Sequence, residues 1–183
     1  MTERGLRVEL LSQNHDRAGF SSGNDDLDRY FREQAGQDQK RRLSAVFVLH
    51  DVANDIVAGY YTLSACEIEP GALPNEIAKR LPRRPLPATL IGRLATDLRY
   101  RGQGLGGMLL VNALTRAANA SRGIGAMAVI VDAKDDQARG FYERYGFQRF
   151  ADDPHRLFLP MADAERVARI TGSPQVSPPS CAG

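Results

Sequence analysis

A glycine-rich segment between an apolar strand and an apolar helix places the strongest constraint on what this chain can fold into. It reads Arg99-Tyr100-Arg101-Gly102-Gln103-Gly104-Leu105-Gly106-Gly107, after apolar residues over 90–95 and before a helix expected over 105–118. Glycines at the start of a helix let a ligand approach the backbone, and the free N–H groups of the first turn favour an anion. With the charges of Arg99 and Arg101, the segment predicts a pyrophosphate-binding loop.

Three known phosphate-binding patterns fit this loop to different degrees. A Walker loop ends in Gly-Lys-Ser/Thr, whereas this one ends in Gly106-Gly107-Met108, which excludes that pattern. The dinucleotide pattern G-x-G-x-x-G is matched, and Asp132 stands where a ribose-binding acid would lie, but a Rossmann domain usually begins with its glycine loop. The third pattern, Arg/Gln-x-x-Gly-x-Gly/Ala, is matched by Arg101, Gly104 and Gly106.

The size and composition of the chain favour one globular domain. Its 183 residues are 43% hydrophobic and 25% charged, which suits a single α/β domain, expected over 1–170. Residues 171–183 contain proline and serine but no charge, and we expect a disordered tail. The net charge is only +2, yet basic residues gather in the first half, which favours a local anion-binding face.

The cysteines and the hydropathy indicate the setting. Cys66 and Cys181 form neither a metal-binding spacing nor a disulfide framework, so we expect no metal site and a reducing, cytoplasmic environment. No window approaches the roughly 20 apolar residues of a membrane span, and no membrane association is expected.

The first half of the chain reads as a strand, a helix and a hairpin. A strand is expected over 6–11, and Asn24 or Asp25 caps a helix that continues to about residue 39. The side chains expected on its buried face are Leu27, Tyr30, Phe31 and Gln34. Strands over 45–49 and 56–64 form a hairpin, in which Gly59 marks a bulge or a close approach.

A proline-rich insertion and a second set of elements complete the pattern. Residues 67–87 form the insertion, with a short helix over 76–81. The expected elements that follow the glycine loop are a strand over 126–131, a helix between Asp135 and Gly146, strands over 147–150 and 157–159, and a helix over 163–170. This order predicts an α/β fold with a mixed, mostly antiparallel sheet of six to seven strands and helices on both faces.

A second motif gives the glycine loop a family context. The segment Ala138-Arg139-Gly140-Phe141-Tyr142-Glu143-Arg144-Tyr145-Gly146-Phe147 is similar to the A-x-x-F-Y-x-x-x-G-F segment of GNAT-family N-acetyltransferases, and the glycine loop resembles their coenzyme A loop. The resemblance implies the GNAT fold, with its sheet splayed at the cofactor site, and acetyl-CoA as cofactor. The cofactor-binding residues that it implies are Leu94, Ala95, Thr96, Arg101, Gly102, Gln103, Gly104, Leu105, Gly106 and Asp135, the last in place of a common asparagine.

Acetyl transfer from a thioester requires few side chains. Charge develops on the carbonyl oxygen, where a backbone N–H can stabilise it, and the leaving thiolate benefits from a proton donor. Tyr142 is the expected general acid, although a helical tyrosine is more often a core residue; Tyr145 and Tyr100 are the fallback donors. No histidine lies near either motif, so an α-amine of pKa about 7.7–8.0 is an easier acceptor than a lysine amine of about 10.4.

Further segments resemble one subgroup, the bacterial GNAT toxins of the TacT and AtaT type. These segments include Leu27-Asp28-Arg29-Tyr30-Phe31, Val57-Ala58-Gly59-Tyr60-Tyr61-Thr62-Leu63 and Ile91-Gly92-Arg93-Leu94-Ala95. The resemblance implies a toxin that acetylates the α-amine of aminoacyl-tRNA and blocks translation. It also implies a ribbon-helix-helix antitoxin, operator DNA bound only through that antitoxin, and a homodimer.

A tRNA acceptor requires cations around the site. The residues expected to supply them are Lys40, Arg41, Arg42, Arg83, Arg84 and Arg93. The triplet over 40–42 also has a purely structural explanation, because cations suit the C-terminal end of a helix. Two other functions stay open: an ordinary GNAT enzyme that acetylates a small amine or a protein amine, and a degenerate domain that only senses coenzyme A.

Overall fold

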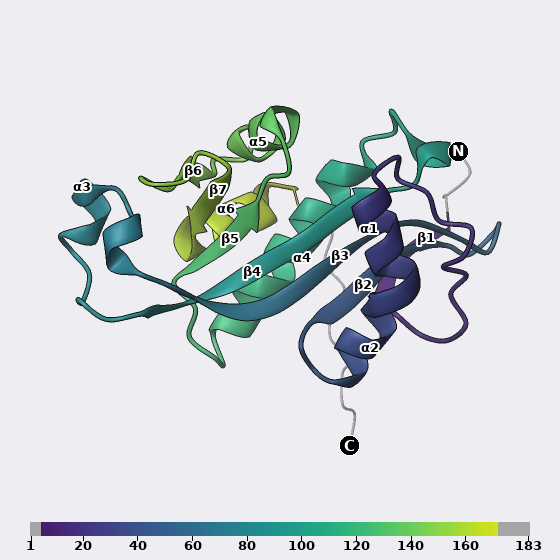
Figure 1. Cartoon of the computed structure of the whole chain (residues 1–183), viewed down its shortest axis with the longest axis horizontal. Coiled ribbons are helices and arrows are strands. Elements are labelled where there is room, and N and C mark those ends of the chain that lie inside the picture. Colours follow the sequence, from purple (N-terminus) through teal and green to yellow (C-terminus); the bar gives the residue numbers. More distant parts are fainter. Residues whose placement is uncertain (1–4, 172–183) are drawn as a thin grey trace, which may run out of the picture.

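A seven-stranded sheet forms the centre of the computed structural model, which describes residues 5–171 (Figure 1). The strand order is β1-β2-β3-β4-β5-β7-β6, and only the β4–β5 pair is parallel. The strands are β1 (Leu6–Leu10), β2 (Ala45–Asp51), β3 (Ile56–Ile68), β4 (Leu86–Thr96), β5 (Ala128–Asp132), β6 (Gln148–Arg149) and β7 (Arg156–Pro160). The expected mixed, mostly antiparallel sheet is confirmed, while the tail over 172–183 lies outside the described residues.

The first helical segment is continuous over residues 25–40 but changes its winding in the middle. It consists of α1 (Asp25–Arg29), a π-helical turn (Tyr30–Gln34) and α2 (Ala35–Lys40), and the side chain of Asn24 caps it by accepting from the Leu27 N–H. A π turn inserts one extra residue into the helical repeat. Phe31 and Ala35 are therefore buried, and the expectation that Gln34 lies on the buried face was wrong, since Gln34 is exposed.

Both faces of the sheet are covered, because successive strand residues point to opposite sides. On one face α4 (Leu105–Ser121) packs over β3 and β4, and α6 (Met161–Thr171) packs against α4, β5 and β7; the core on this face includes Phe47 and Leu49. On the other, α1 and α2 pack over Val46 and Val48. Figure 1 shows α1 and α2 in front of the sheet and α4 behind it. Among residues 5–171, no helix combines the length and apolar character that a membrane span requires.

Gly59 marks both features that the sequence offered as alternatives. The β2–β3 register shifts between Leu49 and His50, which is a bulge. A Cβ on Gly59 would lie 2.7 Å from Leu109 Cδ1 and 2.9 Å from the Ala95 carbonyl oxygen. Only glycine lets β3 approach β4 and α4 so closely.

The proline-rich insertion is shorter than expected, since β3 and β4 extend into it as far as the Ile68–Leu86 pair. Its helix α3 is Asn75–Ala78 instead of 76–81. Leu81 precedes Pro82, and the ring of a proline disfavours helical dihedrals in the residue before it. The helix therefore cannot continue past Leu81, and after Lys79 only i→i−3 bonds remain, from Arg80 to Ile77 and from Leu81 to Ala78. The excursion forms a small lobe at one end of the molecule (Figure 1).

The sheet opens between β4 and β5, as the resemblance of the two motifs implied. These strands pair only over Thr89–Ile91 and Val129–Val131. Leu94, Ala95 and Thr96 still pair with β3, but within the described residues they have no partner on the β5 side. The C-terminal end of β4 thus presents unpaired backbone N–H and C=O groups to the opening between the two strands.

Candidate functional site

A cavity of about 340 Å³ lies where β4 separates from β5. One wall is the open edge of β4, and the opposite wall is α5 (Asp136–Glu143) with the residue that follows it. Its lining residues are Ser22, Leu27, Leu94, Ala95, Thr96, Arg101, Gly106, Lys134, Asp135, Gln137, Ala138, Phe141, Tyr142 and Arg144. The structure therefore brings both sequence motifs to one cavity, together with the three expected β4 residues.

The helix α4 begins at this cavity without a capping side chain. Its N-cap is Gly104, in the left-handed region at φ 73°, and no side chain caps the first turn. The first i→i−4 bond is donated by the Met108 N–H, so the N–H groups of Leu105, Gly106 and Gly107 precede the intrahelical ladder. Of the expected loop residues, Gly102, Gln103 and Gly104 are exposed, while the Leu105 side chain lies in the core.

Aromatic side chains of the second motif pack on the glycines of the first. A Cβ on Gly106 would lie 3.8 Å from the Phe141 ring, and one on Gly107 would collide with the Tyr145 hydroxyl. The two motifs are thus complementary in shape: small residues on α4 admit the bulky residues of the second motif. This packing fixes the position of Tyr142 relative to the first turn of α4.

Tyr142 lines the cavity but is only 7% exposed. Its ring contacts Phe141 and Phe147 in edge-on geometry, with centroids 5.1 and 5.6 Å away. Among the described residues its hydroxyl has no hydrogen-bond partner, so it is available to a ligand. Burial, with a smaller contribution from the charge of Asp132, raises the pKa of Tyr142 and keeps the hydroxyl protonated at neutral pH.

The two fallback donors have other positions. The Tyr100 hydroxyl donates a 2.6 Å hydrogen bond to Asp51 Oδ2, and burial followed by that bond raises its pKa to about 12. The Tyr145 hydroxyl lies against Gly107. Neither residue lines the cavity, so the geometry favours Tyr142 over both.

The charges around the cavity differ from those expected. Arg101 lines it, but Arg99 turns away: its Nε donates to Asp97 Oδ1 at 2.7 Å and its guanidinium also bonds Asp97 Oδ2 at 2.9 Å. The expectation that Arg99 adds charge to the cradle was therefore wrong. Lys134 and Arg144 supply cations that sequence reasoning missed, although Lys134 could have been noticed because it follows the carboxyl end of β5.

Asp135 also has a structural role. Its carboxylate caps α5 by accepting from the Ala138 N–H at 2.7 Å, and Lys134 Nζ lies 3.9 Å from its other oxygen. A carboxylate engaged in this way can orient α5 at the rim of the cavity. Direct contact with a cofactor stays a prediction for this residue.

A serine–carboxylate pair on the α1 side of the cavity was missed from the sequence. The Ser22 hydroxyl donates a 2.6 Å hydrogen bond to Asp28 Oδ1, which also accepts from the Ser22 N–H at 2.8 Å. Asp28 is only 4% exposed, while Ser22 lines the cavity. The Ser22 hydroxyl and Tyr142 thus line the same cavity. Ser22 and Asp28 are six residues apart in sequence and form no recognisable motif.

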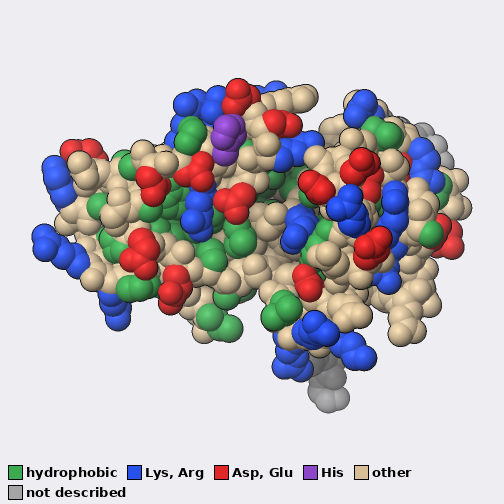
Figure 2. Space-filling view, viewed as in Figure 1, with side chains coloured by type: hydrophobic (Ala, Val, Ile, Leu, Met, Phe, Trp, Pro, Cys, Tyr) green, Lys and Arg blue, Asp and Glu red, His purple; other side chains and the backbone are tan. Residues whose placement is uncertain are grey.

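The expected tRNA-binding cations are not brought together. Arg93 stacks over the Tyr30 ring, with its guanidinium carbon 3.5 Å from the ring centroid. Lys40, Arg41 and Arg42 are exposed at the end of α2, and Arg83 and Arg84 are exposed in the α3 lobe. Figure 2 shows basic side chains gathered over the α3 end and below α2, with mixed charges between them.

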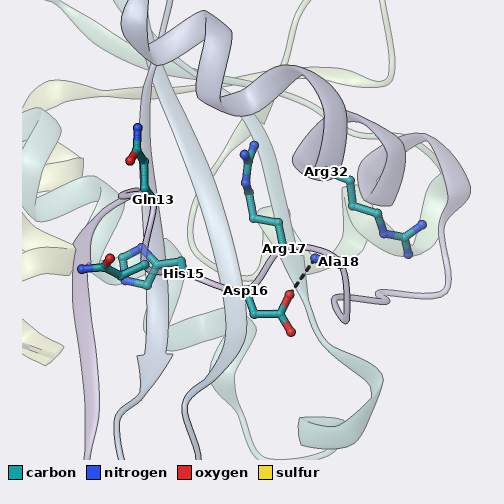
Figure 3. Close-up of a pocket in the computed structure, with 7 residues that line it drawn as sticks. Gln13, His15, Asp16, Arg17, Ala18 and Arg32 are labelled. Carbon is teal, nitrogen blue, oxygen red and sulfur yellow. Dashed lines mark hydrogen bonds between the residues drawn. The ribbon is translucent and has the colours of Figure 1, made fainter.

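A separate hollow of about 500 Å³ lies along the loop between β1 and α1. Its lining is Gln13, Asn14, His15, Asp16, Arg17, Ala18 and Arg32, and Figure 3 shows Asp16 bonded to the Ala18 N–H. It shares no residue with the cavity at the end of β4, and neither sequence motif reaches it.

Comparison with known proteins identifies the fold and its relatives. The family model of the Acetyltransferase (GNAT) domain matches residues 42–149. A tRNA-acetylating toxin of Mycobacterium tuberculosis is 35% identical over 86% of this chain and 93% of its own length. A probable toxin TacT of Sinorhizobium fredii is 33% identical over 85% of this chain and 91% of its own length.

Solved structures of related proteins have the same fold. The Y145F mutant of KacT has a TM-score of 0.84 at 28% identity, covering 89% of this chain and 99% of its own. AtaT complexed with acetyl-methionyl-tRNAfMet has a TM-score of 0.82 at 27% identity, covering 88% and 98%. AtaTR bound with AcCoA has a TM-score of 0.79 at 27% identity, covering 89% and 98%.

Proposed function

Because the chain belongs to the GNAT acetyltransferase family, we propose that it transfers the acetyl group of acetyl-CoA to the α-amine of an aminoacyl-tRNA. The acceptor is supported by the tRNA-acetylating relative and by the similarity to AtaT, which was solved with acetyl-methionyl-tRNAfMet. One observation carries the proposal: the open edge of β4, the uncapped first turn of α4 and the Tyr142 hydroxyl meet at a single cavity.

The residues present suit acetyl-CoA, which supplies an acetyl group activated as a thioester. The first-turn N–H groups of α4 and the charge of Arg101 would hold the pyrophosphate, and Lys134 lies at the same cavity. The unpaired backbone of Leu94, Ala95 and Thr96 would pair with the amide groups of the pantetheine arm. A free N–H of this edge would also stabilise negative charge on the carbonyl oxygen.

Tyr142 acts at the sulfur in this proposal. Its hydroxyl stays protonated and has no competing partner among the described residues, so it can donate to the sulfur as negative charge develops there. Positioned general acids of this kind contribute roughly 10²–10⁴-fold to a rate. The raised pKa keeps the proton on the hydroxyl at neutral pH, so the hydroxyl can donate a hydrogen bond to the sulfur as negative charge develops there.

The acceptor amine would enter from the α1 side. An α-amine with pKa about 7.7–8.0 is partly neutral at pH 7 and needs little help from a base. The Ser22 hydroxyl, which donates to the buried Asp28 carboxylate, can accept a hydrogen bond from that amine and orient it. We assign Ser22 and Asp28 a positioning role toward the acceptor.

The tRNA body would contact the exposed cations outside the cavity. Lys40, Arg41 and Arg42 lie at the end of α2 and Arg83 and Arg84 in the α3 lobe, so only a long polyanion can reach both groups. Arg93 is stacked on Tyr30 and is the expected cation nearest to the β4 residues of the cavity in sequence. Phosphate contacts at both ends would position the acceptor end without reading its sequence.

The test is acetylation of purified substrates. Wild-type protein is incubated with labelled acetyl-CoA and a set of charged tRNAs, with the same tRNAs deacylated as the matched control. We expect label on at least one charged tRNA, none on deacylated tRNA, and slow transfer to small amines. Equal transfer to free amines or protein lysines would favour the alternative of an ordinary GNAT enzyme; acetyl-CoA binding without turnover would favour a coenzyme A sensor.

The biological setting belongs to the same proposal. An enzyme that blocks the α-amine of aminoacyl-tRNA stops translation, so we assign the chain to the cytoplasm and to a toxin–antitoxin pair. A ribbon-helix-helix antitoxin would neutralise it and would carry any contact with operator DNA. The similarity to AtaTR and to a KacTA–DNA complex, at 27% identity and TM-scores of 0.79 and 0.77, supports this setting. A homodimer stays a prediction, which light scattering would test.

A further inference from the structure

Glu9, His15 and His50 meet at the β1 edge of the sheet, outside the cavity that carries the proposed chemistry. Glu9 Oε1 lies 2.8 Å from His15 Nε2 and 3.1 Å from His50 Nδ1. One ligand-type atom from each residue lies within 4.8 Å of the other two. No sequence pattern indicates this cluster, since Glu9 and His50 are 41 residues apart.

The fold explains how these side chains converge. Arg7 is the β1 partner of His50, so Glu9, two residues further along, is a diagonal neighbour of His50 on the same face of the β1–β2 pair. His15 comes from the loop after β1, and its ring stands edge-on to that of His50 with centroids 5.0 Å apart. Three separate segments of backbone therefore supply one group each.

We propose that Glu9, His15 and His50 bind a divalent transition-metal ion, zinc by the chemistry of the ligands, and tie β1, the following loop and β2 together. Two imidazoles and one carboxylate with a remaining open position form a zinc-type donor set. Bonds of about 2.0–2.2 Å in a tetrahedral site separate neighbouring ligand atoms by roughly 3.3–3.6 Å. The two separations at Glu9, 2.8 and 3.1 Å, would widen by roughly 0.2–0.8 Å, and the two histidine nitrogens, which lie within 4.8 Å of each other, would adopt the same spacing.

The surroundings of His50 match those of a metal ligand. While Nδ1 faces the centre of the cluster, Nε2 lies 2.9 Å from Asp55 Oδ1. A ligating histidine typically donates its other ring N–H to a carboxylate, which fixes the tautomer and the ring orientation. Asp55 would therefore be the outer carboxylate of a carboxylate–histidine–metal arrangement.

His15 must change its tautomer to serve as a ligand. Its Nδ1 accepts from the Ser12 N–H at 2.9 Å, so a neutral ring carries its proton on Nε2 and donates it to Glu9. Metal binding at Nε2 moves the proton to Nδ1, where Ser12 Oγ, 3.3 Å away, can accept it. The Ser12 N–H then loses its ring acceptor, a cost that the metal bond must exceed.

The site is also accessible to a small ion. The side chains of Glu9 and His50 are 36% and 16% exposed, while that of His15 is 4% exposed. The cationic Arg17 and Arg32 donate to the carbonyl oxygens of Phe31 and Phe20, and Figure 3 shows both side chains pointing away from His15. Water can fill the remaining coordination position from the exposed side.

The experiment titrates the metal-free full chain with Zn²⁺ alone by calorimetry, in a Cys66→Ser/Cys181→Ser background that removes thiol ligands. We expect one ion per chain. Glu9→Gln and His50→Gln should each weaken binding at least tenfold, and Asp55→Asn about 10–100-fold. His155→Gln is the matched control, because His155 also lies 2.9 Å from a carboxylate, Asp136, but outside the cluster.

A second measurement on unsubstituted side chains covers variants that fail to fold. Bound zinc should protect His15 and His50, but not His155, from modification by diethylpyrocarbonate, and Co²⁺ should give the visible bands of a four-coordinate site. Absence of zinc binding, full affinity in both Glu9→Gln and His50→Gln, or equal protection of His155 would overturn the proposal. None of these readouts depends on acetyl transfer.

Discussion

Replacing Tyr142 by phenylalanine removes one oxygen atom from the wall of the cavity and tests the proposed chemistry directly. The hydroxyl has no hydrogen-bond partner among the described residues, so its removal breaks no internal hydrogen bond. The ring contacts with Phe141 and Phe147 remain. We therefore expect the free energy of unfolding to change by less than about 1 kcal/mol and the affinity for acetyl-CoA to be preserved.

The rate should respond very differently. Loss of a positioned proton donor lowers kcat by roughly 10²–10⁴-fold, which is about 3–5 kcal/mol of transition-state stabilisation. Single-turnover transfer to charged tRNA measures this loss, with acetyl-CoA binding and thermal unfolding measured on the same preparation. In cells, the substitution should abolish toxicity.

Tyr100→Phe is the matched control, with the opposite expectation. Its hydroxyl donates to Asp51 over 2.6 Å, and a hydrogen bond to a charged group is worth about 1.5–3 kcal/mol. Stability should therefore fall while kcat changes little. Full transfer activity in Tyr142→Phe, or an equal loss in both variants, would refute the assignment of Tyr142 as the proton donor.

Three further changes follow from the structure. Gly104→Ala should lower the free energy of unfolding by about 1–2 kcal/mol, because φ is 73° at this position, and should weaken acetyl-CoA binding. Denaturant unfolding measures the first effect and calorimetry the second. Gly125→Ala is the control that should show neither effect, since a Cβ at Gly125 would also meet open space. Replacing Arg83 and Arg84 by alanine should lower the salt dependence of tRNA binding by about 0.7–0.9 in log–log slope per lost phosphate contact, without changing transfer to a small amine; an unchanged slope would exclude both residues from the tRNA contact. Burial of Asp97 favours a higher pKa, but hydrogen bonds from Arg99 and Ser21 outweigh burial and lower the pKa of this carboxyl below 3.8. The stability that the Asp97 carboxylate contributes is therefore present above pH 4 and is lost as the pH falls through the lowered pKa. Asp97→Asn should therefore be less stable than the wild type at neutral pH, and the difference should shrink in acid; a constant difference between pH 7 and pH 2 would contradict this.

Sequence reasoning succeeded where short segments determine local geometry. The glycine run fixed the start of α4 because Gly104 adopts a positive φ, and Asn24 fixed the start of α1 because its side chain accepts from the Leu27 N–H. Hydrophobic periodicity located the strands and the long helix. It failed at Gln34, because no pattern signals that a π turn inserts one residue.

The site was predictable in its backbone parts and less so in its side chains. The motifs indicated the β4 edge, the α4 turn and Tyr142, all of which line or border one cavity. The direction of Arg99 depends on the buried Asp97, which turns it toward the loop over 19–21. The Ser22–Asp28 pair and the Glu9–His15–His50 cluster depend on how loops and strands meet, so no spacing in the sequence announces them.

The opening between β4 and β5 has a consequence for how this protein can vary. Main-chain groups recognise an amide-bearing arm without reading side chains, so the half-buried Leu94 and Thr96 can exchange their side chains while the donor substrate stays the same, although the buried Ala95 cannot. Selection can then reshape this wall for a new amino-acid acceptor at little cost to thioester binding. The same property makes the edge vulnerable: a short extended peptidomimetic that fills it would compete with the donor, and substitutions at Leu94 or Thr96 would provide little resistance.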